Sequence, residues 1–151
     1  MTTSRNRVAV LHGVNFDVLD RRDPEIYSGL SLSELEHKIS DWAHELSLEP
    51  IFFQTNSEGE FCEYLHRSID LADAVIVNAG AWTHYSRAIA DALELTRLPA
   101  VEVHLSDVEA RDDWRELSVF DGLVAAKISG QGPDGYREAL GLLSRELGVS
   151  S

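Results

Sequence analysis

The clearest chemical signal in the sequence is a glutamate and a histidine two positions apart, Glu102 and His104, at the end of an apolar run. Residues two apart on a strand point to the same face of a sheet. A carboxylate among valines is costly to bury without a partner, and the imidazole of His104 is the obvious one. Such a pair fixes the imidazole tautomer and favours its protonated form, so His104 is a candidate general acid. The alternative is an exposed edge strand with two ordinary polar residues.

The residues that follow this pair could hold an anion. The backbone amides of Leu105 and Ser106 are placed to cradle a negatively charged group. Arg111 and Arg115 are four residues apart, so on a short helix they share one face. In a chain with 26 acidic and 13 basic residues, an arginine pair next to these residues suggests a substrate that carries a carboxylate. A solvated, salt-bridged helix explains the two arginines equally well.

A second group of candidates lies on a long polar connection, residues 12–27, and on a later segment of small residues. Connections of this length are uncommon in compact domains and often act as lids. Within it, the guanidinium of Arg22 near the phenol of Tyr27 would favour the phenolate, which is a usable base. The alternative is a surface arginine and a packing tyrosine. Asn78 and His84 flank small residues that let a ligand approach the backbone, although a structural turn has the same composition.

The alternation of apolar runs and amphipathic stretches predicts the scaffold that brings these residues together. The apolar runs predict strands at 8–11, 50–54, 74–77, 99–103 and 123–128. The amphipathic stretches predict helices at 31–46, 58–69, 86–95 and 136–147. The first of these helices opens with a capping box formed by Ser31 and Glu34, and Ile69 is expected to face inward on the second.

This alternation predicts an α/β fold: a flavodoxin-like three-layer sandwich whose five-stranded parallel sheet has the order 2-1-3-4-5 and helices on both faces. Ligands of such sheets bind beyond the carboxyl ends of the strands, near the point where the strand order reverses. The loops after the first, third and fourth strands carry all the candidate residues above, so we expect one site there.

The composition restricts the class of protein. A length of 151 residues fits a single catalytic domain, and we expect residues 1–7 and 149–151 to be flexible tails. The formal net charge of −13 argues against binding to nucleic acid or to an anionic membrane. No apolar run is long enough to span a membrane, and the polar first residues do not form a signal peptide. We therefore expect a cytoplasmic protein.

Several motifs that look functional have simpler explanations. The single cysteine, Cys62, excludes an internal disulfide and a cysteine zinc cluster. The six histidines match no metal-binding spacing. Residues 130–135 match the G-x-G-x-x-G pattern of dinucleotide-binding loops, but too little chain follows for the acidic residue that would bind the ribose. We interpret this segment as a tight turn before a helix and expect no metal or cofactor.

From Val8 to about Leu143, the chain resembles the type II 3-dehydroquinate dehydratase (dehydroquinase) family. The resemblance is carried by five ordered segments, 13–27, 52–60, 78–93, 101–115 and 130–136. It implies a lyase that removes water by anti elimination through an enolate, without a Schiff base, metal or cofactor. The substrate would be the cyclic carboxylate 3-dehydroquinate, and the step would belong to the shikimate pathway of aromatic amino acid biosynthesis.

The resemblance also implies a role for each proton-transfer residue. Tyr27 would remove the proton from the carbon next to the substrate ketone, with Arg22 holding it as the phenolate. Asn15 would position the water that stabilises the enolate. His104, oriented by Glu102, would protonate the departing hydroxyl group.

Binding roles and assembly follow from the same resemblance. Asp91 would reach in from a neighbouring subunit of a dodecamer built from four trimers, and Arg111 would lie close to the lid. The other substrate-binding residues would be Leu105 and Ser106, whose amides hold the carboxylate, and Asn78, His84 and Arg115, which bind hydroxyl groups.

The chain departs from the family pattern near the site while keeping every proton-transfer residue. On the lid, the usual proline, second asparagine and glycine are replaced by Val14, Asp17 and Asp20. Further along, Asp107 replaces an asparagine and Glu109 replaces an aromatic residue or histidine. These changes leave an alternative open, in which the enzyme acts on a related cyclic hydroxy-ketone, such as an amino-dehydroquinate, in secondary metabolism.

Other classes of protein share the predicted strand order. A receiver-like signalling module would need a phosphorylatable aspartate where Asn78 stands. A flavodoxin-like electron carrier would need a phosphate loop rich in serine, threonine and glycine, whereas residues 13–27 are rich in asparagine, aspartate and arginine. A catalytically silent homologue would bind a ligand without turning it over.

Overall fold

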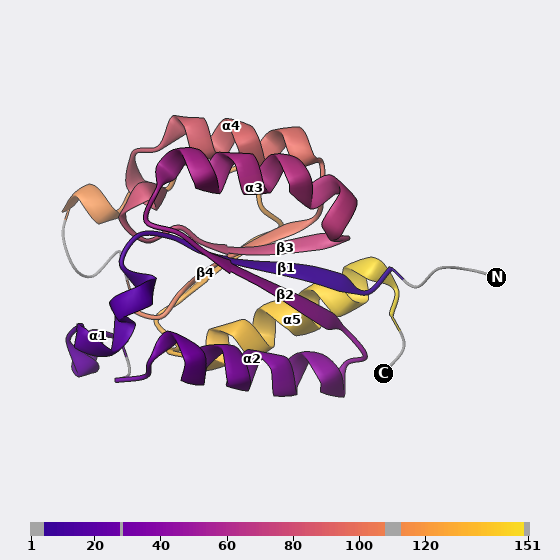
Figure 1. The fold of residues 1–151 in the computed structure, drawn as a ribbon, viewed down its shortest axis with the longest axis horizontal. Coiled ribbons are helices and arrows are strands. Elements are labelled where there is room, and N and C mark those ends of the chain that lie inside the picture. The colour runs from indigo at the N-terminus through magenta and orange to yellow at the C-terminus, as the bar shows by residue number, and fades with distance from the viewer. Residues whose placement is uncertain (1–4, 28, 108–112, 150–151) are drawn as a thin grey trace.

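Five parallel strands form the central sheet of the computed structural model, in the order β2-β1-β3-β4-β5 that the sequence predicts. The structure describes residues 5–27, 29–107 and 113–149. The strands are β1 (Arg7–His12), β2 (Glu49–Gln54), β3 (Ala74–Asn78), β4 (Ala100–His104) and β5 (Ala126–Ser129). Helices α3 and α4 cover one face of the sheet, and α2 and α5 cover the other (Figure 1).

The helices and short 3-10 turns alternate with the strands along the chain. The α-helices are α1 (Pro24–Tyr27), α2 (Leu32–Glu45), α3 (Glu58–Leu71), α4 (Arg87–Thr96) and α5 (Asp134–Leu147). The 3-10 turns are η1 (Phe16–Arg21), η2 (Gly80–His84) and η4 (Asp113–Arg115). In the described part of the chain, no helix is long and apolar enough to cross a membrane.

Burial on both faces explains why the central strands are continuous apolar runs. On β1, Val8 and Val10 pack in the core beneath α2 and α5. The alternate residues Ala9 and Leu11 pack in the second core, beneath α3 and α4. Successive side chains of a strand point to opposite faces, so the central strands β1, β3 and β4 contribute to both cores.

Local hydrogen bonds begin the helices where the sequence predicts them. The Ser31 hydroxyl accepts a bond from the Glu34 amide, and the Glu34 carboxylate accepts one from the Ser31 amide, which completes the capping box. The glycine-rich segment 130–135 is a turn that leads into α5, as predicted. Its Gly130 and Gly132 both have positive φ.

Two predicted details are wrong. The fifth strand begins at residue 126 rather than 123, because Leu123 lies in a turn closed by a bond from its amide to the Phe120 carbonyl. Ile69 is 52% exposed, because the buried line of α3 passes through Ser68, whose hydroxyl bonds to the Tyr64 carbonyl.

One residue of each expected tail, Arg7 and Val149, packs with the rest of the fold. β1 begins at Arg7, whose guanidinium pairs with Asp73 at 3.1 Å. At the other end, Val149 packs against the core beneath α2 and α5, and its amide bonds to the Ser144 carbonyl.

At the carboxyl ends of the strands, where the polar residues lie, the backbone after β1 passes very close to the backbone after β3. The amide of Gly13, the residue after β1, bonds to the Asn78 carbonyl at 2.9 Å. A Cβ atom added at Gly13 would lie 2.3 Å from the Ala79 carbonyl oxygen, so only glycine fits between these two strand ends.

We predict that Gly13→Ala destabilises the fold, because the methyl group must push two backbones apart. The expected loss in free energy of unfolding is about 1–3 kcal/mol, the range of overpacking substitutions, measured by urea denaturation. Gly141→Ala is the matched control: its added Cβ would make only an ordinary contact with Arg145 within α5, and it should be neutral or stabilising. Equal stability of the two variants would contradict the prediction.

Candidate active site

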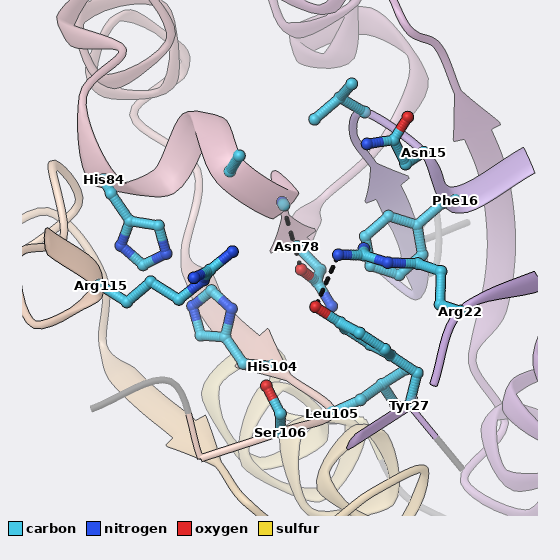
Figure 2. Close-up of a pocket in the computed structure, with 13 residues that line it drawn as sticks. Asn15, Phe16, Arg22, Tyr27, Asn78, His84, His104, Leu105, Ser106 and Arg115 are labelled. Carbon is cyan, nitrogen blue, oxygen red and sulfur yellow. Dashed lines mark hydrogen bonds between the residues drawn. The ribbon is translucent and has the colours of Figure 1, made fainter. Parts of the chain in front are cut away.

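A cavity lies beyond the carboxyl ends of β1, β3 and β4, where the sequence predicts the site. Its empty space, including the open mouth, is about 470 Å³. Figure 2 shows the side chains that point into it. The lining residues are Val14, Asn15, Phe16, Arg22, Tyr27, Asn78, Gly80, Ala81, His84, His104, Leu105, Ser106 and Arg115.

The lid segment brings Arg22 and Tyr27 together on one wall of the cavity. Tyr27 ends α1 and is buried, and Arg22 lies in the extended stretch after η1. The Arg22 Nη2 atom donates a hydrogen bond to the Tyr27 phenol oxygen at 2.6 Å (Figure 2). The guanidinium carbon lies 3.8 Å from the centre of the phenol ring. A cationic donor on the phenol oxygen stabilises the phenolate, as expected for a base.

Glu102 and His104 form a buried pair at the end of β4. The His104 Nε2 atom lies 2.5 Å from Glu102 Oε2. β4 lies between β3 and β5 in the sheet, and Glu102 has no exposed surface, so the exposed-strand alternative is wrong. The carboxylate accepts a proton-bearing nitrogen and stabilises positive charge on the ring, which suits a general acid.

His84 lies next to His104 on the cavity wall, and a backbone carbonyl holds its ring in place. Its Nδ1 atom lies 2.7 Å from the Leu117 carbonyl oxygen. A carbonyl only accepts, so Nδ1 carries the proton and Nε2 of the neutral ring is an acceptor. Burial lowers the pKa of His84 and favours this neutral form, while the Leu117 bond acts in the opposite direction. The His84 and His104 ring centres are 6.3 Å apart.

Arg115 supplies a second cation to the cavity. It ends η4, and its guanidinium carbon lies 3.9 Å from the centre of the Trp114 ring. Arg111, its predicted partner, lies outside the described residues. The described lining residues include two arginines and no aspartate or glutamate. In a chain with a net charge of −13, this lining favours an anionic ligand.

Asn78 is held by a network that the sequence analysis did not identify. The Asn78 Nδ2 atom donates to the Tyr136 hydroxyl at 3.1 Å, and His12 Nε2 lies 2.8 Å from the same oxygen. Burial lowers the pKa of His12 to about 3 and raises the pKa of Tyr136 above its ordinary value, so both side chains stay neutral. The amide of Gly80 donates to Asn78 Oδ1. These bonds fix the orientation of the Asn78 amide.

Asn15 and the lid substitution Asp17 are joined by Asn56, another residue that the sequence analysis missed. Asn15 has a left-handed φ of 72° and lines the cavity. The backbone N–H of Asn15 donates to Asn56 Oδ1 at 2.8 Å. Asn56 Nδ2 in turn donates to Asp17 Oδ2 at 3.1 Å. The Asp17 carboxylate is thus bound to Asn56, and Asp17 is not one of the described lining residues.

The remaining predicted residues fall into two groups. Leu105 and Ser106 line the cavity, and their carbonyls accept the amides of Gly132 and Gly130, which secures the segment after β4. Asp91 is exposed on α4 and does not line the described cavity. Its role toward a neighbouring subunit stays a prediction.

Comparison with known proteins relates this arrangement to one family. The model of the family described as dehydroquinase class II matches residues 6–144. A 3-dehydroquinate dehydratase from Syntrophotalea carbinolica is 47% identical over 139 residues, which cover 91% of this chain and 93% of that one.

Solved structures show the same likeness. A type II dehydroquinase from Propionibacterium acnes superposes with a TM-score of 0.89 at 35% identity, covering 95% of this chain and 99% of that one. One from Butyrivibrio crossotus has a TM-score of 0.88 at 31% identity, covering 92% and 97%.

The buried, neutral His12 predicts an acid-dependent loss of stability. Burial lowers the pKa of His12 from its ordinary value of 6.5 to about 3, so between these pH values the unfolded chain binds a proton at His12 and the folded chain does not. The contribution is about 1.4 kcal/mol per pH unit, lost as the pH falls through this window.

We expect His12→Asn, which keeps a polar side chain next to Tyr136, to make the slope of unfolding free energy against pH shallower by about that amount between pH 6 and pH 4. Urea denaturation at several pH values measures both slopes. Parallel slopes for the two proteins would show that His12 is not the group responsible.

Proposed function

The chain belongs to the class II dehydroquinase family, and we propose that it is a 3-dehydroquinate dehydratase. It removes water from 3-dehydroquinate by anti elimination, through an enolate, to give 3-dehydroshikimate. The observation that carries this proposal is the placement of two activated groups on one cavity. Tyr27 with Arg22 forms one wall, and His104 with Glu102 forms another (Figure 2).

In the first step, the Tyr27 phenolate takes the proton from the carbon next to the ketone. The Arg22 guanidinium, bonded to the phenol oxygen at 2.6 Å, supplies the positive charge next to the atom that accepts the proton. Negative charge then develops on the ketone oxygen and must be stabilised where it forms. Asn15, held by Asn56, lines the same wall and positions the water that donates to this oxygen.

In the second step, the enolate expels the hydroxyl group as His104 protonates it. A hydroxide ion is a poor leaving group, so the acid lowers this barrier. Glu102 stabilises the imidazolium before the transfer and keeps the ring in place after it. The proton gained by Tyr27 and the proton lost by His104 balance, so the enzyme returns to its starting state by exchange with solvent.

The cavity recognises the substrate through its charge and hydroxyl groups. The amides of Leu105 and Ser106 hold the carboxylate, and the two arginines of the lining supply the positive field. Asn78, His84 and Arg115 bind hydroxyl groups: all three line the cavity, and hydrogen bonds fix the orientation of Asn78 and His84. The Asp17 carboxylate accepts a bond from Asn56 Nδ2 and is not one of the described lining residues, so this substitution leaves the described lining unchanged.

The setting of the reaction follows from the same proposal. The enzyme acts in the shikimate pathway, in the cytoplasm, and assembles as a dodecamer of trimers in which Asp91 contributes to a neighbouring site. Support for the assembly is the exposure of Asp91 on α4, away from its own cavity.

We predict that Tyr27→Phe lowers kcat on 3-dehydroquinate by about 10²–10⁴-fold, the usual contribution of a general base, and leaves KM nearly unchanged. The assay is the rise in ultraviolet absorbance from the conjugated enone product. Tyr85→Phe is the matched control, because Tyr85 is exposed and lies outside the described lining. Wild-type protein that gives no product would refute the proposed function, and an active Tyr27→Phe variant would refute the assigned base.

We also predict that Asp17→Asn leaves kcat within about twofold of wild type, since Asn56 engages this side chain away from the cavity. Asn56→Ala should instead lower kcat, because it frees both Asp17 and the Asn15 amide. The expected loss is about tenfold, as for removal of a group that holds a reacting partner in place. A large gain for Asp17→Asn would show that its charge opposes substrate binding.

A further inference from the structure

Residues 117–120, which we name the support segment, lie behind the cavity and bond to His84 and to Glu102, the partner of His104. The Leu117 carbonyl accepts the bond from His84 Nδ1. The Val119 amide donates to the carbonyl of Thr83, the residue before His84, at 2.8 Å. Phe120 is fully buried in the core beneath α3 and α4. The support segment is therefore fixed to the core at one end and to η2 at the other.

Ser118, within the support segment, binds the carboxylate that orients His104. Its hydroxyl oxygen lies 2.9 Å from Glu102 Oε1 and 3.0 Å from Oε2. The Phe120 amide donates to the same hydroxyl oxygen at 3.1 Å. A hydroxyl has one proton, and here an amide already occupies its acceptor side, so that proton is directed at Glu102. Ser118 is 4% exposed and is not one of the described lining residues.

Glu102 consequently receives donors from two sides. The Ser118 hydroxyl donates to the carboxylate from one side. The His104 Nε2 proton is directed at Glu102 Oε2 from another side, with the two atoms 2.5 Å apart. A carboxylate that is held by two donors cannot rotate without breaking one of them in a buried place, which is costly. The His104 ring is therefore held with its Nε2 proton directed at Glu102, so Nδ1 is the ring nitrogen that can give a proton to the substrate.

We propose that Ser118 is a positioning residue for the acid step. It holds the Glu102 carboxylate in the orientation that directs the His104 ring at the departing hydroxyl group, and the neighbouring Leu117 carbonyl fixes His84 in the same way. The support segment thus sets the geometry of both imidazoles from outside the cavity. The assignment to an acid step rests on the proposed function, whereas the hydrogen-bond chain does not.

Loss of the Ser118 hydroxyl leaves the buried Glu102 carboxylate with His104 as its one side-chain donor among the described residues. Glu102 is then free to rotate or to draw the proton from His104, and either change removes acid from the cavity. Removal of groups that orient functional histidines costs about 10–100-fold at metal sites, and we expect a fall in kcat of that size. KM should stay within about twofold, because Ser118 does not line the described cavity.

The test uses Ser118→Ala and Ser118→Cys in the full chain. Cysteine fills the space of serine and is slightly larger, but it donates only weakly, so it reports the lost hydrogen bond even where alanine impairs folding. Ser118→Thr keeps the hydroxyl and should restore kcat. Ser68→Ala is the matched control, because it also removes a buried serine hydroxyl, on α3 and outside the described cavity lining. Its kcat should equal that of wild type.

A proton NMR measurement supplies a readout that does not depend on turnover. The His104 Nε2 proton, bonded to a buried carboxylate, gives a downfield signal that Glu102→Gln identifies by removing it. In Ser118→Ala and Ser118→Cys this signal should shift or broaden, and in Ser68→Ala it should not. An unchanged signal or an unchanged kcat in the two Ser118 variants would overturn the proposal, as would an equal loss in Ser68→Ala. Wild-type protein without turnover would refute the proposed function alone, since the NMR comparison still tests Ser118.

Discussion

A buried carboxylate imposes the strictest constraint on this structure. Glu102 has no exposed surface, and an isolated charge in such a place would destabilise the fold. It is tolerated because His104 and Ser118 satisfy it, at 2.5 Å and 2.9 Å. The same hydrogen bonds that stabilise the buried carboxylate also order the site. They fix the orientation of the His104 imidazole at the cavity wall.

The opposite wall of the cavity is formed by the connection between β1 and α2. Tyr27 lies on a one-turn helix of the lid rather than on the sheet, and its partner Arg22 comes from the same segment. The proposed acid is therefore positioned by the sheet, and the proposed base by the connection between β1 and α2. Because Arg22 and Tyr27 come from the same segment, their contact at 2.6 Å does not depend on how that segment lies against the sheet.

Sequence patterns predicted the parts of the site that depend on short-range spacing. The Glu102–His104 pair follows from strand alternation, and the position of the cavity follows from the strand order. Ser118, Asn56 and Tyr136 were missed because each acts across a distance in sequence that no periodicity records.

In the fold too, features set by neighbouring residues were predicted, and a feature set by a turn bond was not. Capping and alternation located nearly every helix and strand, whereas the late start of β5 depends on a turn bond to Phe120, which no pattern of apolar residues reveals.

The proposed assignment of Tyr27 as the base and His104 as the acid can be tested directly by hydrogen exchange in 3-dehydroquinate. In deuterium oxide, His104→Gln should still exchange the proton next to the ketone, because Tyr27 remains, while forming little product. Tyr27→Phe should lose exchange and product together. NMR of the recovered substrate would show deuterium at that carbon in the first variant alone. Exchange that persists in Tyr27→Phe and disappears in His104→Gln would reverse the assignments and contradict the account.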